Sequence, residues 1–215
     1  MPGLLIIEAR QEKYEDSYYT SARLKTQGLR SFQYGRIEAR LKVPEGAGLW
    51  PAFWILGSGF DGTNWPDCGE IDIMEYVGRE PDLIIGTAHG PGYSGALGLS
   101  RWNRRPYDIA DEFHTYAIEW DEFEIRWYFN GTLYAVQNSW FSIAEDFPAP
   151  FNQNFYVLFN LAVGGNFPGS PDGTTASPSI RTASHAACTL TTAAGRGSSD
   201  SSTSPRRWAS GGSAW

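Results

Sequence analysis

The 215-residue sequence contains few of the residues that build metal centres or disulfide frameworks. It has two cysteines, Cys68 and Cys188, and only three histidines, which are widely separated. Because none of these residues has the spacing of a zinc site, we expect no metal and no cofactor. A disulfide between the two cysteines stays open from the sequence, although Cys188 lies in a segment without a strand pattern.

The sequence also lacks long apolar runs and an excess of positive charge. No segment is long and apolar enough to span a bilayer, and residues 1–7 are too short and not basic enough for a signal peptide. The 17 Lys and Arg residues are outnumbered by 24 Asp and Glu residues, which gives a net charge of −7. Nucleic-acid binding usually requires a basic stripe. We therefore expect neither a membrane nor a nucleic-acid partner.

Aromatic residues, in contrast, are abundant. The chain has nine Trp, eleven Tyr and twelve Phe residues, more than its hydrophobic core requires. Flat aromatic rings stack on sugars and on nucleobases. Because the negative net charge disfavours a polyphosphate, the composition favours a neutral polysaccharide as the partner.

Short alternating segments separated by Gly- and Pro-containing turns predict an all-β protein, and no start signal of a helix occurs in the first ninety residues. The predicted strands are residues 4–10, 20–26, 32–43, 49–56, 69–77, 83–89, 115–120, 124–129, 132–136 and 155–163. Residues 90–106 are rich in Gly and Pro and are predicted to form a functional loop. About ten short strands of this kind are typical of an antiparallel β-sandwich.

The composition changes abruptly from about residue 174 onward, where Ser, Thr, Ala and Gly dominate. Such a segment cannot bury enough apolar area to offset the entropy lost on ordering. We therefore predict one folded domain over residues 1–173 and a low-complexity, disordered tail over residues 174–215.

The stretch of residues 69–77 places Glu70, Asp72 and Glu75 in a strand that is otherwise apolar. Burying one carboxylate costs several kcal/mol unless it is paired or hydrogen-bonded. Side chains of a regular strand alternate between faces, so Glu75 would point away from the other two acids. One extra residue around Ile73 and Met74 would bring all three to one face, and such bulges are frequent beside active sites.

The spacing of the two glutamates fits a two-carboxylate reaction. With the bulge, Glu70 and Glu75 lie four pleat steps apart, about 13 Å along the backbone. Side chains that lean toward each other close much of this gap, toward the roughly 5–5.5 Å carboxyl separation of retaining glycoside hydrolysis. The alternative is an edge strand with solvated acids, but this arrangement leaves the strand without a clean hydrophobic face.

Six segments extend this pattern over most of residues 4–173: YGRIEAR at 34–40, GLWPAFW at 48–54, WPDCGEIDIMEY at 65–76, HGPGYSG at 89–95, FHTYAIEW at 113–120 and NLAVGG at 160–165. In this order they resemble glycoside hydrolase family 16, in its laminarinase-like branch of endo-β-1,3-glucanases. The resemblance implies a β-jelly-roll sandwich with a concave substrate cleft, in which β-1,3-glucan is cleaved by a retaining double displacement.

The resemblance also implies roles for individual residues. Glu70 matches the nucleophile, and Glu75 matches the acid that protonates the leaving oxygen and then activates water. Asp72 lies between them, and its charge helps to keep one proton within the cluster, because neighbouring carboxylates raise each other's pKa.

Further candidates match cleft positions of the family. The candidates for sugar stacking are Trp50, Trp54 and Trp65, and for each a core position is the alternative. His89 matches a histidine that faces the cleft near the acids, and a hydrogen-bonded structural histidine is the alternative. Arg36 and Asn160 are candidates for hydrogen bonds to the sugar or the nucleophile.

The resemblance has gaps at both ends. Family members carry further strands before the position of Met1 and a final strand after residue 175, and a calcium site of the family takes its ligands from these ends. We therefore hypothesise an incomplete copy of the catalytic domain, monomeric and without a metal, with the extracellular or periplasmic location of the family. The alternatives are a mixed-linkage β-1,3-1,4-glucanase, a non-catalytic glucan-binding sandwich and an inactive fragment.

Overall fold

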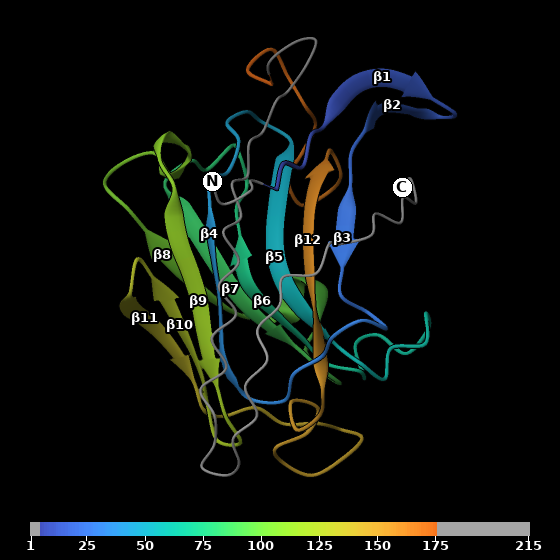
Figure 1. Ribbon diagram of the computed structural model, residues 1–215, viewed down its shortest axis with the longest axis vertical. Helices are drawn as coiled ribbons and strands as arrows, with labels where there is room; N and C mark the ends of the chain where they lie inside the picture. Colours follow the sequence, from blue (N-terminus) through green and yellow to red (C-terminus); the bar gives the residue numbers. More distant parts are fainter. Residues whose placement is uncertain (1–4, 176–215) are drawn as a thin grey trace.

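The computed structural model describes residues 5–175, which form twelve β-strands and two short 3₁₀ turns (Figure 1). The strands are β1 (Arg10–Tyr14), β2 (Ser17–Thr20), β3 (Arg23–Lys25), β4 (Gly35–Leu41), β5 (Leu49–Gly57), β6 (Glu70–Glu75), β7 (Leu83–His89), β8 (Leu99–Arg104), β9 (His114–Trp120), β10 (Ile125–Phe129), β11 (Thr132–Gln137) and β12 (Phe155–Val163). The 3₁₀ turns are η1 (Gly95–Leu97) and η2 (Ile109–Asp111). In this part of the chain no helix is long and apolar enough to cross a membrane.

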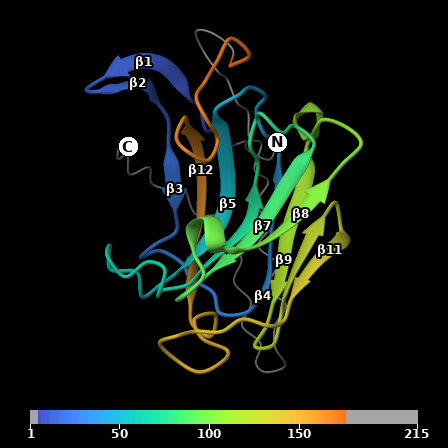
Figure 2. The ribbon, with the colours of Figure 1, turned by 180° about the vertical axis from the view of Figure 1, so that it is seen from behind.

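The strands form two large sheets that pack face to face (Figures 1 and 2). The six-stranded sheet has the order β3-β12-β5-β6-β7-β8, and the four-stranded sheet has the order β11-β10-β9-β4. The hairpin of β1 and β2 stands apart as a two-stranded sheet, and all paired strands run antiparallel. The predicted antiparallel β-sandwich is confirmed.

The main core lies between the two sheets, because each strand turns alternate apolar side chains inward. On β6 the inward residues Ile71 and Ile73 are 0% and 1% exposed, so Asp72 between them belongs to the opposite face. Trp127 of β10 lies in the core and donates its indole N–H to the backbone carbonyl of Asp72 at 2.9 Å. The second sheet therefore supports the acidic strand from behind.

The structure contradicts the sequence prediction at two places. Residues 5–8 are not in a strand, and β1 begins at Arg10, near the end of the predicted strand 4–10. The predicted loop 90–106 contains β8, which pairs with β7 over its length. The sequence of β8 does not read as a strand, because its half-buried face carries the polar residues Arg101 and Asn103 beside Leu99. Residues 176–215 of the predicted tail 174–215, which include Cys188, lie outside the described residues, and the predicted domain boundary stays a prediction.

Candidate active site

A β-bulge in β6 sets the direction of the acidic side chains. Asp72 lies opposite Thr87 and Glu75 lies opposite Ile85, so three steps along β6 correspond to two steps along β7. In the pairing with β5, Met74 lies opposite Phe53 and Asp72 lies opposite Trp54, so the pairing skips Ile73. The predicted bulge at Ile73 or Met74 is confirmed, and it brings Glu75 to the face that carries the other two acids.

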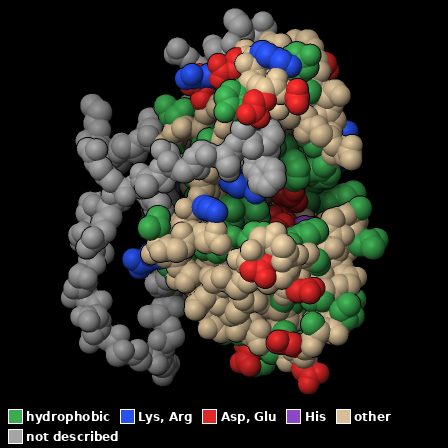
Figure 3. Space-filling view, turned by 90° about the vertical axis from the view of Figure 1, so that its right-hand side faces the viewer, with side chains coloured by type: hydrophobic (Ala, Val, Ile, Leu, Met, Phe, Trp, Pro, Cys, Tyr) green, Lys and Arg blue, Asp and Glu red, His purple; other side chains and the backbone are tan. Residues whose placement is uncertain are grey.

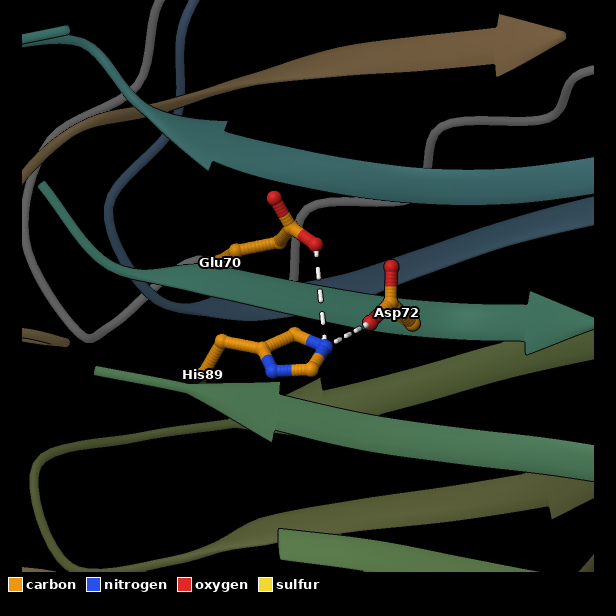
Figure 4. Close-up of side chains that lie close together, drawn as sticks. All are labelled: Glu70, Asp72 and His89. Atoms are coloured by element: carbon orange, nitrogen blue, oxygen red, sulfur yellow. Dashed lines mark ion pairs between the residues drawn. The ribbon is translucent and has the colours of Figure 1, made fainter. Parts of the chain in front are cut away.

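His89 lies directly opposite Glu70 on the neighbouring strand β7 and faces both acids (Figure 4). Its Nε2 atom is 3.1 Å from Oδ2 of Asp72 and 3.8 Å from Oε1 of Glu70. The imidazole and the Asp72 carboxyl are both buried. The structure thus places His89 beside the acids, where it can share a proton with Asp72.

Neutral donors hold the two glutamates. The Trp65 indole donates its N–H to Oε2 of Glu70 at 2.9 Å, and the Trp50 indole donates to Oε1 of Glu75 at 3.2 Å. The second carboxyl oxygen of Glu75 accepts a hydrogen bond from the hydroxyl of Thr87 at 3.1 Å. Trp50 and Trp65 are therefore hydrogen-bond donors to the acids, in addition to being sugar-stacking candidates.

Burial sets the proton affinity of the acids. Burial and then the neighbouring Asp72 charge raise the pKa of Glu70, and burial raises the pKa of Asp72. For Glu75, burial followed by the Asp72 charge raises the pKa to about 8, although His89, Thr87 and Trp50 act in the opposite direction. Burial thus favours the protonated form of all three acids, and Glu75 in this form can donate a proton.

Three buried carboxyls with raised pKa values on one face of a strand agree with the comparison with known proteins. Residues 5–178 match the family Glycosyl hydrolases family 16. The chain belongs to this family. The resemblance inferred from the sequence is confirmed.

Relatives of this family-16 chain include glucanases. The "Beta-glucanase" of Rhodothermus marinus is 46% identical over 173 residues, which cover 78% of this chain and 60% of the relative. The "Glucan endo-1,3-beta-glucosidase" of Cryptopygus antarcticus is 35% identical over 177 residues, which cover 77% of this chain and 64% of the relative. The chain thus spans less than two thirds of the length of either protein. The solved endo-β-1,3-glucanase of Pyrococcus furiosus has a TM-score of 0.75 and 41% identity, covering 88% of this chain and 77% of that chain.

The acids lie on the outer face of the six-stranded sheet, in a hollow that is here called the cleft (Figure 3). Figure 3 shows acidic side chains and a histidine in a hollow bordered by hydrophobic side chains. Trp65 is 42% exposed, and Phe167 packs edge-on against Trp50 with 5.0 Å between ring centroids. Aromatic faces beside polar groups are suited to binding a polysaccharide.

The predicted residues Trp54 and Asn160 lie on this face and contact each other. The indole of Trp54 donates to Oδ1 of Asn160 at 2.8 Å. Trp54 is only 9% exposed, so it forms part of the cleft floor rather than an open stacking surface. The guanidinium of Arg23 lies 5.3 Å from the ring centroid of Trp54, and the charge of Arg23 interacts with Glu70. Sequence reasoning missed Arg23, because a single arginine in a short strand carries no motif.

The prediction for Arg36 is wrong. Arg36 lies on β4 in the other sheet, where its guanidinium pairs with Glu38 at 2.5 Å and with Glu119 at 3.1 Å. Because its neighbour Ile37 fills the core, Arg36 points to the solvent side of the four-stranded sheet. Side-chain alternation places Arg36 on the face opposite Ile37, away from the core. It does not show to which of the two sheets the strand belongs.

Gly98 provides a test of how tightly His89 is held. A Cβ atom added there would lie 2.5 Å from Cε1 of His89 and 2.6 Å from Nδ1. The backbone at Gly98 (φ −56°, ψ 151°) suits alanine, so the substitution acts through contact alone. We expect Gly98→Ala to displace His89 and lower kcat/KM about 10- to 100-fold, measured by reducing-end release from a glucan.

The matched control is Gly173→Ala, where an added Cβ meets no atom within 4 Å. It should leave kcat/KM unchanged. Full activity of Gly98→Ala would show that the position of His89 is not critical.

Proposed function

We propose that the chain is an endo-acting retaining glycoside hydrolase that cleaves β-1,3-glucan through a covalent glycosyl-enzyme intermediate. The observation that carries this proposal is the bulge in β6, which places Glu70, Asp72 and Glu75 together on one face. The glucanase names of the family-16 relatives support the substrate class. The substrate is a neutral polysaccharide, as the negative net charge favours.

In the first step, the Glu70 carboxylate attacks the anomeric carbon of the sugar. The glycosidic C–O bond breaks, and Glu75 transfers its proton to the leaving oxygen. Burial favours the protonated form of Glu75 that this step requires. Trp65 and His89 favour the anion of Glu70, since both lower its pKa against the effect of burial.

In the second step, Glu75 is ionised and takes a proton from water while the water oxygen attacks the anomeric carbon. The bond to Glu70 breaks, and the product retains its anomeric configuration. A proton on Asp72, whose pKa is raised by burial, lets Glu70 carry the negative charge when it leaves.

The substrate class is tested by incubation with laminarin, lichenan, agarose and carrageenan. We expect the fastest reducing-end release from laminarin, with long internal fragments appearing early and the β-anomer formed first in the NMR spectrum. Equal release from lichenan would favour the mixed-linkage alternative. Binding to laminarin without any release would favour the non-catalytic alternative, and release from agarose alone would contradict the substrate class.

A further inference from the structure

Thr87 connects the buried Glu75 carboxyl to the surface of the cleft. Its Oγ1 atom donates to Oε2 of Glu75 at 3.1 Å and lies 3.2 Å from the hydroxyl oxygen of Ser100. Thr87 is 2% exposed, whereas Ser100, directly opposite on β8, is exposed. A chain of hydrogen-bonding groups therefore crosses from β6 over β7 to β8.

The two neighbours that hold Glu75 differ in their hydrogen-bonding capacity. The indole of Trp50 can only donate, so it suits the ionised carboxylate. The hydroxyl of Thr87 can donate or accept, and either hydroxyl can be the donor in its contact with Ser100. When Glu75 is ionised, Ser100 donates to Thr87 and Thr87 donates to Glu75. When Oε1 carries the proton, Oε2 still accepts the hydrogen bond from Thr87, and the proton stays available to the leaving oxygen.

The charged groups that face Glu75 come from two strands. On β6, Asp72 and Glu70 oppose its ionisation, and on β7, His89 favours it. The strand β5 contributes the neutral indole of Trp50, and β8 contributes the neutral hydroxyl of Ser100 through Thr87. These charges favour one protonation state or the other, whereas the Thr87 hydroxyl can donate to Oε2 in both states and binds the ionised carboxylate more strongly.

We propose that Thr87, supported by Ser100, is a positioning residue that holds Glu75 in both of its protonation states during the catalytic cycle. The inference rests on the proposed function, in which Glu75 is an acid in the first step and a base in the second. A residue with two opposite roles needs a partner whose hydrogen bond keeps the carboxyl in place in both of them.

The test compares Thr87→Val, which keeps the shape without the hydroxyl, with Thr87→Ser, which keeps the hydroxyl. The substrate is an aryl β-glucoside of laminari-oligosaccharide with a good leaving group, for which the base-assisted second step limits kcat. We expect Thr87→Val to lower this kcat about 10-fold and Thr87→Ser to retain most of it. Ser100→Ala should have a smaller effect in the same direction, because it removes only the outer hydroxyl.

The pH profile separates this role from a purely structural one. In the wild type acting on laminarin, whose leaving oxygen needs a proton, kcat/KM should fall as the pH rises through the pKa of Glu75, about 8. The Thr87 hydroxyl stabilises the ionised carboxylate, so its removal raises this pKa further and moves the basic limb upward by about one pH unit. A basic limb of Thr87→Val that coincides with that of the wild type would overturn the proposal. So would a Thr87→Ser variant that loses as much kcat as Thr87→Val.

If the wild type cleaves none of the glucans, the proposed function fails but the positioning role is still measurable. The Glu75 carboxyl is then titrated by NMR in ¹³C-labelled protein. A higher pKa in Thr87→Val than in the wild type supports the hydrogen-bonding role, and an identical pKa in the two proteins overturns it.

Discussion

Glu70→Gln is expected to lower kcat on laminarin on the order of 10⁴-fold or more, because the amide cannot form the glycosyl-enzyme bond. The amide keeps the size of the side chain and can still accept the hydrogen bond from Trp65, so the cleft retains its shape. Binding of laminarin, measured by calorimetry, should change little. Reducing-end release measured under saturating laminarin gives the comparison.

The matched control is Glu122→Gln, the same substitution at an exposed glutamate in the segment between β9 and β10. It should have wild-type activity. Trapping with a 2-fluoro glucoside inactivator should label a peptide that contains Glu70 in the wild type. A label on another carboxylate, or a Glu70→Gln variant as active as the wild type, would contradict the assignment of the nucleophile.

Glu70→Gln should also make the protein more stable at neutral pH. Burial raises the pKa of Glu70 in the folded state, so the folded protein binds this proton more tightly than the unfolded chain does. Stability from this group is present at acidic pH and is lost as the pH rises from the unfolded pKa toward the raised folded pKa. The neutral amide of Glu70→Gln avoids this loss of stability. We therefore expect the variant to have a melting temperature about 2–4 °C higher than the wild type at pH 7. At pH 4 the two proteins should melt closer together, which calorimetric scans at both pH values would show.

Glu75→Ala is expected to lower kcat/KM on laminarin about 10²- to 10⁴-fold, since the leaving oxygen loses its proton donor. For an aryl glycoside with an acidic leaving group the loss in kcat/KM should be much smaller, because that group departs without protonation. The second step becomes slow for both substrates, because no carboxylate at position 75 takes the proton from the attacking water. The glycosyl-enzyme should therefore accumulate, and mass spectrometry would detect it.

Azide provides the deciding measurement for Glu75→Ala. The anion needs no base, and it should enter the space left by the carboxyl and restore turnover with a β-configured glycosyl azide as the product. Glu70→Ala is the control, because azide replacing the nucleophile gives the α-configured product. An azide product of α configuration from Glu75→Ala would contradict the assignment of acid and base.

Several features of the site were predictable because local sequence constrains them. Three acids in an apolar strand are costly to bury unpaired, and because side chains alternate between faces, a bulge near Ile73 was predicted, with a solvated edge strand as the alternative. The register of β6 against β5 and β7 shows this bulge. The antiparallel sandwich followed from the spacing of apolar segments and turns, because such segments must bury one face against another sheet.

The tertiary structure alone decided which groups surround the acids. Trp50, Thr87 and His89 reach them from neighbouring strands, so their contacts depend on strand order and register. Arg36 lies on the polar face of β4, but β4 belongs to the four-stranded sheet, whereas the acids lie on the six-stranded sheet.

The sequence by itself determined the family, the acidic trio and the need for a bulge, because these depend on residues close together in the chain. The strand order and register decided the hydroxyl pair of Thr87 and Ser100, the cleft position of Arg23 and the exclusion of Arg36. These contacts join residues far apart in the chain, and side-chain alternation specifies a face of a strand without specifying its neighbour.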